Sequence, residues 1–465
     1  MSKSVSLEFH GAAGSVSGSC FELRSADRCV IIDCGLFEGT RTLEALNRGS
    51  FGFDPASVNA VILTHARLDH SGRLPLLARH GLCAPLWCSQ PTADMLAPLL
   101  RGNAEILKAD ATRRNARDDR LDRPPFVPLY TEEDVGACLA AIVVAPLCEW
   151  IDLGAGWGFR LWNSLHITGS TSVELMIDDL RILFSGNVGE GSAVLCAGAE
   201  LGGFDHVICE TTFGDSVREP ILLSDRREQL ARHVETTLRD GGNLVIPSEA
   251  LEQTQAVLED LADLIDSGRI PILPILVDQP YSAEMAAAIL LHRDPALNLL
   301  LRPNVQFDCA AAGSAAQSDV YGAIILAASR NCQTGPIRRH LIQNLPRPQS
   351  RILFVNNQVA GSLGERLLSR PEEVRISGHD VRVVADIVTL DAYETHADRA
   401  ALLQWICTRA PVSGSIFLVH GDKAALATLA LDITHHPDLC QPIVPALGDI
   451  WQLGAAKPAT RLHTA

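Results

Sequence analysis

The segment Val61–His70 constrains the fold of this chain more than any other feature of the sequence. It opens with an apolar run typical of a buried strand, and a cluster of His65, Asp69 and His70 follows at once. Imidazole and carboxylate groups are common zinc ligands, and a loop that follows a strand can hold several of them at one edge of a sheet. We therefore expect an α/β fold in which this strand leads into a metal-binding loop.

Arg67 interrupts this cluster of potential ligands. A guanidinium group has five N–H donors, it has no lone pair to give to a metal, and it stays charged at any working pH. The same short segment therefore indicates a metal site and removes one ligand from it.

The composition describes a globular protein. The chain has 465 residues, which suggests two or three domains, and 47% of them are hydrophobic while 20% are charged. The net charge of −16 argues against a general polyanion-binding surface but leaves room for a local basic groove. The thirteen cysteines form no Cys-x-x-Cys pair, which favours free thiols in a reducing cytoplasm. No apolar run reaches the roughly 18 residues of a membrane span, so we expect a cytoplasmic protein without a membrane partner.

Periodicity divides the chain into two α/β patterns. Up to about residue 200, strands alternate with helices, including a helix over Thr92–Leu100, and the polar stretch Ala109–Pro125 is typical of a loop or mobile flap. From about residue 206, helices such as Ser224–Asp240 alternate with short apolar strands such as Gly242–Pro247. The pattern closes with a strand at Gly414–Val419 and a helix at 422–433.

Short motifs follow one another along nearly the whole chain. They are Gly11–Cys20, Ile31–Gly39, Phe53–Pro55, Val61–Leu74, Pro128–Asp134, His166–Leu175, Phe184–Gly189, Glu210–Asp215, Phe354–Leu368, Thr395–Arg399 and Val419–Asp422. In order and spacing they resemble the motifs of the β-CASP family of the metallo-β-lactamase superfamily. This is the family of the cleavage and polyadenylation endonuclease subunit and of related bacterial and archaeal RNases.

The resemblance implies both a fold and a chemistry. The fold expected is an αββα metallo-β-lactamase sandwich, residues 1–205 and 391–465, interrupted by an α/β β-CASP domain, residues 206–390, with the active cleft between them. Family members typically hydrolyse single-stranded RNA, and less often DNA, with two zinc ions.

Several residues match functional positions of the family. The implied metal ligands are His65 and His166 at the first zinc, and Asp69, His70 and His420 at the second. The implied catalytic residues are Asp33, which orients ligands, Glu210, which orients the general acid, and His396, which is the general acid and protonates the leaving oxygen.

Two ligand positions depart from the family. Arg67 replaces a histidine of the first metal, and Asn187 replaces the aspartate that bridges both metals. A neutral amide binds zinc far less well than a carboxylate, and two histidines are too few for a tetrahedral site. The resemblance therefore implies at most one zinc ion, and the absence of any metal is equally compatible with the sequence.

The loop that approaches RNA phosphates in the family also departs from its pattern. Here it is Ser329–Pro336, in which side chains replace glycines that let the backbone meet the ligand. Arg330, Arg338 and Arg339 could still line a phosphate path, or could equally be solvated arginines of a loop and helix.

Three hypotheses about function remain open from the sequence. The first is a catalytically silent RNA-binding or scaffold subunit of RNA processing, which would form a homodimer or pair with an active β-CASP paralogue. The second is a one-metal phosphodiesterase that uses Asp69, His70 and His420. The third is a hydrolase or binding protein whose substrate has changed to a small molecule or a non-phosphate ester.

Overall fold

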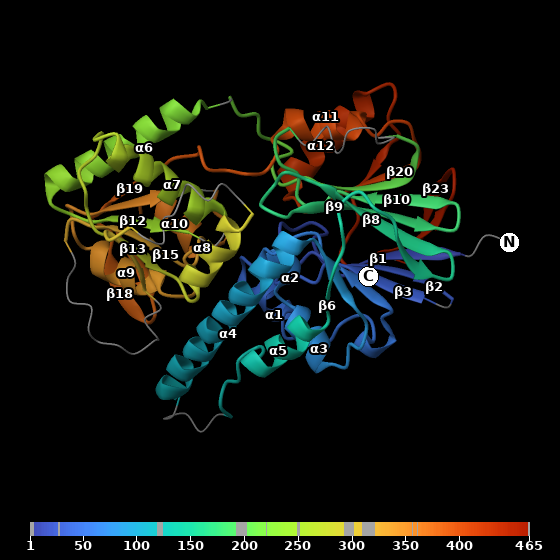
Figure 1. The fold of residues 1–465 in the computed structure, drawn as a ribbon, viewed down its shortest axis with the longest axis horizontal. Coiled ribbons are helices and arrows are strands. Elements are labelled where there is room, and N and C mark those ends of the chain that lie inside the picture. Colours follow the sequence, from blue (N-terminus) through green and yellow to red (C-terminus); the bar gives the residue numbers. More distant parts are fainter. Residues whose placement is uncertain are drawn as a thin grey trace.

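Two lobes divide the molecule, and each is built around β-sheet (Figure 1). The computed structural model describes residues 4–26, 28–118, 124–191, 202–219, 221–248, 252–292, 302–308, 321–355, 357–359 and 361–463. The beginning and the end of the chain share one lobe, on the right of Figure 1, and the middle of the chain forms the other. The second lobe is therefore an insertion into the first.

The first lobe contains two mixed sheets. The eight-stranded sheet runs in the order β23 (Lys457–His463), β22 (Ile450–Gly454), β1 (Val5–Phe9), β2 (Phe21–Ser25), β3 (Arg28–Ile32), β4 (Ala60–Ile62), β5 (Leu86–Cys88) and β6 (Ile142–Val144). The seven-stranded sheet runs in the order β21 (Pro442–Ile443), β20 (Val412–Val419), β11 (Phe204–Glu210), β10 (Leu180–Phe184), β9 (Thr171–Ile177), β8 (Trp157–Asn163) and β7 (Ile151–Gly154).

Aromatic contacts show that these two sheets pack face to face. The ring centroids of Phe9 on β1 and Phe417 on β20 lie 5.4 Å apart, and those of Phe21 on β2 and Phe184 on β10 lie 5.7 Å apart. These side chains belong to one buried cluster that draws on both sheets. Separate clusters join the outer face of each sheet to helices. The lobe is therefore the αββα sandwich that the resemblance predicted.

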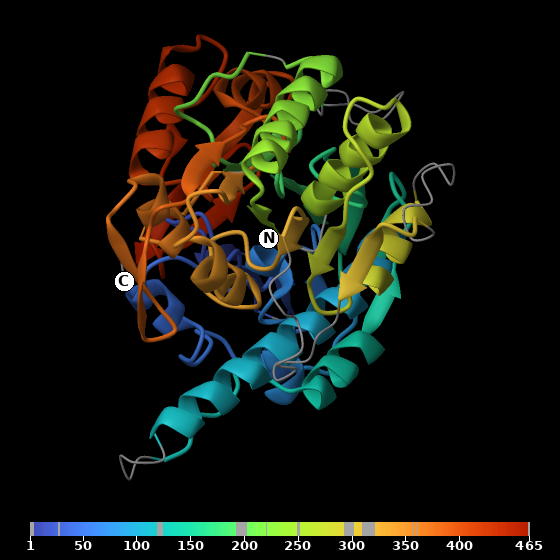
Figure 2. The same cartoon turned by 90° about the vertical axis from the view of Figure 1, so that its left-hand side faces the viewer.

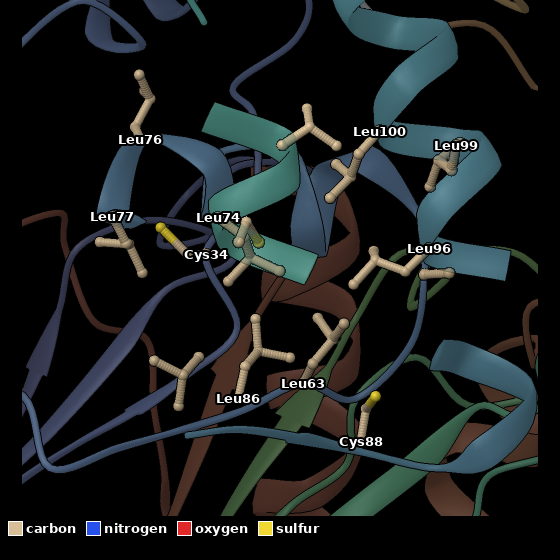
Figure 3. Close-up of a cluster of buried hydrophobic side chains, with 14 of the residues drawn as sticks. Cys34, Leu63, Leu74, Leu76, Leu77, Leu86, Cys88, Leu96, Leu99 and Leu100 are labelled. Carbon is tan, nitrogen blue, oxygen red and sulfur yellow. The ribbon is translucent and has the colours of Figure 1, made fainter. Parts of the chain in front are cut away.

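Helices cover the outer faces of both sheets. Those on the eight-stranded sheet are α1 (Arg41–Leu46), α2 (Leu68–Ser71), α3 (Leu74–Arg79), α4 (Gln90–Asp118) and α5 (Glu132–Ala140), with a 3₁₀ turn at Pro55–Ser57. Those on the seven-stranded sheet are α11 (Arg399–Cys407) and α12 (Lys423–His435). Figure 3 shows the core beneath α3, α4 and α5, where Leu74, Leu96 and Leu100 are fully buried.

Helix α4 is the main departure from the secondary structure that we predicted. We expected a helix over Thr92–Leu100 and a loop or flap over Ala109–Pro125, but α4 continues to Asp118, so the loop prediction is wrong for residues 109–118. Residues 119–123 lie outside the described part of the chain. The stretch has no glycine or proline up to Asp118 and contains good helix formers, but its charges surround the helix and leave no apolar stripe to mark it. The far end of α4 projects from the body of the molecule (Figure 2).

The second lobe is a parallel sheet with helices on both faces. Its order is β14 (Val305–Asp308), β13 (Ile275–Asp278), β15 (Ile324–Ala327), β12 (Leu244–Pro247), β16 (Arg351–Phe354) and β19 (Asp386–Thr389). Helices α6 (Leu223–Asp240) and α7 (Glu252–Asp266) pack on one face, and α9 (Ile337–Asn344) and α10 (Leu363–Leu368) pack on the other. A hairpin of β17 (Glu373–Ile376) and β18 (His379–Arg382) lies beside it. The central strands β12, β13 and β15 are buried along their whole length, which explains their nearly unbroken apolar sequences, whereas the edge strands β14 and β19 are only partly buried.

Helix α8 (Ser282–Leu290) joins the two lobes. Its residues Met285 and Ile289 belong to the same buried cluster as Leu96 and Leu100 of α4. Strand β11, which ends at Glu210, pairs with β10 and β20 in the first lobe. We therefore propose domain limits near residues 210 and 390. No helix in the described part of the chain is long and apolar enough to cross a bilayer.

Candidate metal centre

The candidate site lies where neighbouring strands of the two sheets end. Asp33 follows β3, and Thr64 and His65 follow β4, which runs parallel to β3, so the three residues leave the same edge of the sheet. Helix α2 begins at Leu68 and carries Asp69 and His70 back towards this edge. The local sequence therefore converts two adjacent strand ends into one cluster of polar side chains.

Asp33 fixes the orientation of His70. The Asp33 carboxylate accepts hydrogen bonds from the Thr64 backbone N–H (2.8 Å) and the Ser19 hydroxyl (3.2 Å). Its Oδ2 lies 2.6 Å from His70 Nδ1. Burial opposes protonation of His70, but the Asp33 carboxylate raises the pKa of the imidazole. With Nδ1–H donated to Asp33, the Nε2 lone pair of His70 is available to a ligand, as in metal sites with carboxylate–histidine pairs.

His420 presents a second imidazole to the same point. It follows β20 with a φ of 53°, and its backbone N–H donates to Ala12 O at 2.6 Å. Thr212 donates its hydroxyl to His420 O (3.3 Å) and so accepts from His420 Nδ1–H (3.1 Å), which leaves Nε2 free. The Nε2 atoms of His70 and His420 lie 3.2 Å apart. Ligands of one tetrahedral zinc are separated by about 3.3 Å, as its roughly 2.0 Å Zn–N bonds require.

Asp69, the third implied ligand of this position, is paired with Arg67. The Arg67 Nε and Nη2 atoms lie 3.1 and 3.3 Å from the two Asp69 oxygens. Both side chains are buried, with 8% and 4% of their surface exposed. Burial alone would raise the pKa of Asp69, but the Arg67 charge holds it well below its usual range. Asp69 Oδ2 also lies 3.6 Å from His420 Nε2. The Asp69 carboxylate therefore contacts the Arg67 guanidinium and also lies near the His420 nitrogen that a metal would use.

The other implied metal position lacks a suitable donor set. His65 donates Nδ1–H to Thr64 Oγ1 (2.9 Å), and its Nε2 faces the amide nitrogen of Asn187 at 3.3 Å. An amide N–H donates to that lone pair and so competes with any metal for it. His166 Nε2 and Asn187 Oδ1 are buried and have no hydrogen-bond partner among the described residues. With Arg67 nearby, this position does not fit a zinc ion. At the other position the spacing of the His70 and His420 Nε2 atoms suits two ligands of one zinc ion.

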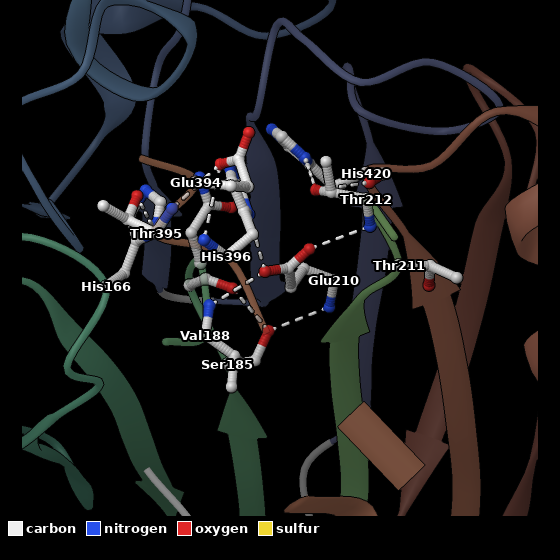
Figure 4. A network of polar contacts seen from close by, with 12 residues as sticks. His166, Ser185, Val188, Glu210, Thr211, Thr212, Glu394, Thr395, His396 and His420 are labelled. Carbon is white, nitrogen blue, oxygen red and sulfur yellow. Dashed lines mark hydrogen bonds and ion pairs between the residues drawn. The ribbon is translucent and has the colours of Figure 1, made fainter. Parts of the chain in front are cut away.

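A second carboxylate–imidazole pair lies beside these groups (Figure 4). His396 Nδ1 lies 3.0 Å from Glu210 Oε1, and Glu210 also accepts the backbone N–H groups of Val188 and Thr212 at 2.9 Å. Burial opposes ionisation of Glu210, but His396, His420 and Thr212 lower its pKa to about 2. The carboxylate is therefore a fixed anion that orients the His396 ring.

The structure brings together all eight residues that the resemblance assigned to the centre. Imidazole rings form a continuous chain, with centroid distances of 4.1 Å for His65–His70, 5.3 Å for His65–His166, 4.2 Å for His166–His396 and 4.9 Å for His70–His420. The sequence did not single out Thr64, Thr212 and Thr395, whose hydroxyls contact three of these rings. Only their positions next to motif residues could have indicated this role.

The three candidate phosphate-binding arginines have other contacts. Arg339 Nη2 lies 2.6 Å from Asp278 Oδ2, and Asp278 also faces His340 at 2.7 Å. Arg338 donates to the backbone oxygen of Gln333 at 3.2 Å. Arg330 is half-buried in the loop that precedes α9.

The fold and the cluster of imidazole and carboxylate groups define a protein of the metallo-β-lactamase superfamily. Residues 13–191 match the model of that superfamily, residues 254–367 match the Beta-Casp domain, and residues 380–437 match the Zn-dependent metallo-hydrolase RNA specificity domain. The chain belongs to the β-CASP family. Membership of the superfamily implies metal binding, typically of zinc, and donor atoms of His65, Asp69 and His70 lie within 4.8 Å of one another.

Curated relatives extend over nearly the whole chain. A ribonuclease of Thermus thermophilus is 32% identical over 435 residues, covering 90% of this chain and 94% of that protein. An RNase J-like protein of Methanocaldococcus jannaschii is 25% identical and covers 92% and 95% of the two chains. The transcription termination factor FttA of Cenarchaeum symbiosum is 26% identical and covers 94% and 70%. A crystal structure of a protein of unknown function from Enterococcus faecalis shares the fold, with a TM-score of 0.51, 15% identity and coverage of 97% and 100%.

Proposed function

We propose that this protein binds single-stranded RNA in RNA processing without hydrolysing it by the two-zinc chemistry of its family. The observation that carries the proposal is the buried pair of Arg67 and Asp69, in which a permanent cation engages the carboxylate that the family resemblance assigns to a metal. A dication and a guanidinium held 4 Å apart repel by roughly 8 kcal/mol at an effective dielectric constant of 20. Asn187 adds no negative charge to offset that repulsion.

Similarity to proteins of RNA metabolism supports RNA as the ligand. A relative named as a ribonuclease and one named as an RNase J-like protein match this chain over more than nine-tenths of their own length, and residues 380–437 match a domain described by its RNA specificity. The partner that would supply catalysis is an active β-CASP paralogue, and a homodimer is the other assembly consistent with a silent subunit.

The test combines three measurements on protein purified with zinc supplied. Elemental mass spectrometry counts the metal, fluorescence anisotropy measures binding of a labelled oligoribonucleotide, and gel electrophoresis follows its cleavage. We expect binding without cleavage. Cleavage that disappears in the His396→Ala variant would overturn the proposal, since only a reaction at this centre depends on that imidazole. Light scattering on the purified chain, alone and with an active paralogue, decides between the assemblies.

A one-metal phosphodiesterase is the second candidate, and a specific observation favours it. The lone pairs of His70 and His420 face each other at 3.2 Å, an arrangement that needs a proton or a metal between the two nitrogens. Asp69, His70 and His420 would hold one zinc, which supplies a Lewis acid for a phosphoryl oxygen. Glu210 would orient His396 to give its proton to the leaving oxygen. About one zinc per chain, lost in Asp69→Ala, together with cleavage would establish this candidate.

A further inference from the structure

A cavity of about 680 Å³ lies where the two lobes meet, outside the metal centre. The loop after β3, helix α1 and helix α4 form one side, and Gln279, Pro280 and Ala328 of the second lobe form the other. Leu36, Phe37 and Leu99 make part of its wall apolar. Its volume is that of sites which bury a nucleotide-sized ligand, and Leu68 places one end next to Arg67 and Asp69 in the sequence.

Two arginines and a phenylalanine at this cavity form an unusual cationic group. The guanidinium carbon of Arg48 lies 4.2 Å from the centroid of the Phe126 ring, and that of Arg114 lies 4.4 Å from the same centroid. Within the described part of the chain, neither guanidinium has a carboxylate oxygen within 4 Å. Burial and the charge of Arg114 both lower the pKa of Arg48. Both guanidinium groups therefore lie against one aromatic ring, and no carboxylate among the described residues neutralises either of them.

Hydrogen bonds from Asn115 and Arg48 hold the segment that contains Phe126 in place. Asn115 of α4 donates its amide N–H to Phe126 O at 3.0 Å and accepts the Phe126 backbone N–H at 2.7 Å. Arg48 donates to Val127 O at 3.0 Å. The ring is therefore fixed against α4, and the two guanidinium groups gain a rigid support whose face favours cations.

The acidic side chains at the cavity do not cancel this charge. Asp110 pairs with Arg113, and Glu38 accepts a hydrogen bond from Asn331 at 3.2 Å. Burial raises the pKa of Glu44, although Arg114 and Arg41 lower it. Arg41, Arg48 and Arg114 thus outnumber the one carboxylate that faces them. A site with paired guanidinium groups and an apolar wall suits a ligand with a phosphate and a planar ring.

We propose that this cavity binds a nucleotide, with its phosphate paired with the Arg48 and Arg114 guanidinium groups and its base against the apolar wall. The nucleotide comes either from single-stranded RNA, in which case the inference rests on the proposed function, or from the free mononucleotide pool. In the first case the cavity binds one nucleotide of an RNA strand, and adjacent nucleotides of that strand lie near the metal centre.

The experiment measures binding of two probes, a short fluorescein-labelled oligoadenylate by anisotropy and adenosine monophosphate by calorimetry. The variants are Arg48→Ala, Arg114→Ala and their combination, with Arg366→Ala on the exposed surface of α10 as the matched control. A further variant, Ala45→Trp, fills the cavity from the exposed helix α1 without removing charge. We expect each arginine variant to weaken binding about tenfold, since a charge-assisted hydrogen bond contributes at least that much. Ala45→Trp should also weaken binding, by more than the control variant Arg366→Ala does.

The outcomes separate this inference from the proposed function. If the wild type binds oligoadenylate and the arginine variants weaken it, both stand. If it binds oligoadenylate but neither the arginine variants nor Ala45→Trp change the affinity, the cavity assignment is overturned and RNA binding stands. If it binds only the mononucleotide, with the same dependence on Arg48 and Arg114, the cavity assignment stands with a free nucleotide as its ligand and the RNA proposal is overturned. Binding of neither probe overturns both.

Discussion

Replacing Arg67 by methionine tests whether this arginine has become a structural part of the centre. Methionine keeps most of the side-chain volume and removes the charge, so Asp69 is left buried without its guanidinium partner. Removal of one member of a buried ion pair typically costs about 3–5 kcal/mol. His420 lies 3.6 Å from Asp69 and supplies a partial replacement, so we expect the free energy of unfolding to fall by about 3 kcal/mol, at the low end of that range.

A double-mutant cycle isolates the pair from the packing around it. Arg67→Met, Asp69→Asn and the combined variant are compared with the wild type by urea unfolding followed by tryptophan fluorescence. The combined variant contains no unpaired charge, so its loss should be smaller than the sum of the single losses by about 2 kcal/mol. If the loss in the combined variant equals the sum of the two single losses to within about 0.5 kcal/mol, Arg67 and Asp69 do not form a stabilising ion pair and the reasoning is refuted.

A matched control comes from a more exposed arginine–aspartate pair in the same lobe. Arg399 contacts both oxygens of Asp432, with 34% and 20% of the two side chains exposed. Arg399→Met should therefore cost less than about 1 kcal/mol. Zinc should stabilise Arg67→Met more than the wild type, because Asp69 is released as a ligand, by about 2.7 kcal/mol when zinc exceeds its Kd a hundredfold.

Three other predictions follow from separate parts of the structure. Arg67→His with Asn187→Asp should raise the zinc content by about one ion per chain in elemental analysis, and an unchanged content would mean that other residues also oppose metal there. Leu100→Ala should reduce the free energy of unfolding by about 2–5 kcal/mol because Leu100 is fully buried, whereas Leu431→Ala, 56% exposed, should change it by less than about 0.5 kcal/mol; equal losses would contradict the assigned core. Burial lowers the pKa of His206, so stability is present above its unfolded-state value of about 6.5 and is lost as the pH falls below it; His206→Gln should flatten this decline, and parallel curves would be inconsistent with the argument.

The family resemblance predicted the architecture of the first lobe and named eight residues that the structure brings close together, because short sequence motifs carry that resemblance. Apolar strands such as β4 end directly at polar residues, so His65 could be placed at a sheet edge from sequence alone. The contact between Arg67 and Asp69 could not be predicted from the sequence. It depends on the extended backbone of Arg67, with φ −59° and ψ 145°, which sends the side chain back over the first turn of α2.

Other features depend on contacts between distant parts of the chain. Helix α4 packs against α8 of the second lobe as well as against the core of the first lobe, and no local pattern shows the contact with α8. Arg48 and Arg114 meet at Phe126 although neither lies in a family motif, and the arginines that the sequence did suggest include Arg339, which is paired with Asp278.

The pairing of β1 with β22 has a consequence for how the protein is made. Val5 lies opposite Leu453, so β1 finds this neighbour only after the second lobe and the strands from β2 to β21 have been synthesised. The parallel sheet of the second lobe is formed from a continuous middle segment and can fold before that point. His420 follows β20, which is likewise synthesised after the second lobe. The nascent chain can therefore carry a folded middle domain while the two sheets around the centre are still incomplete, and their unpaired strand edges favour aggregation during this interval.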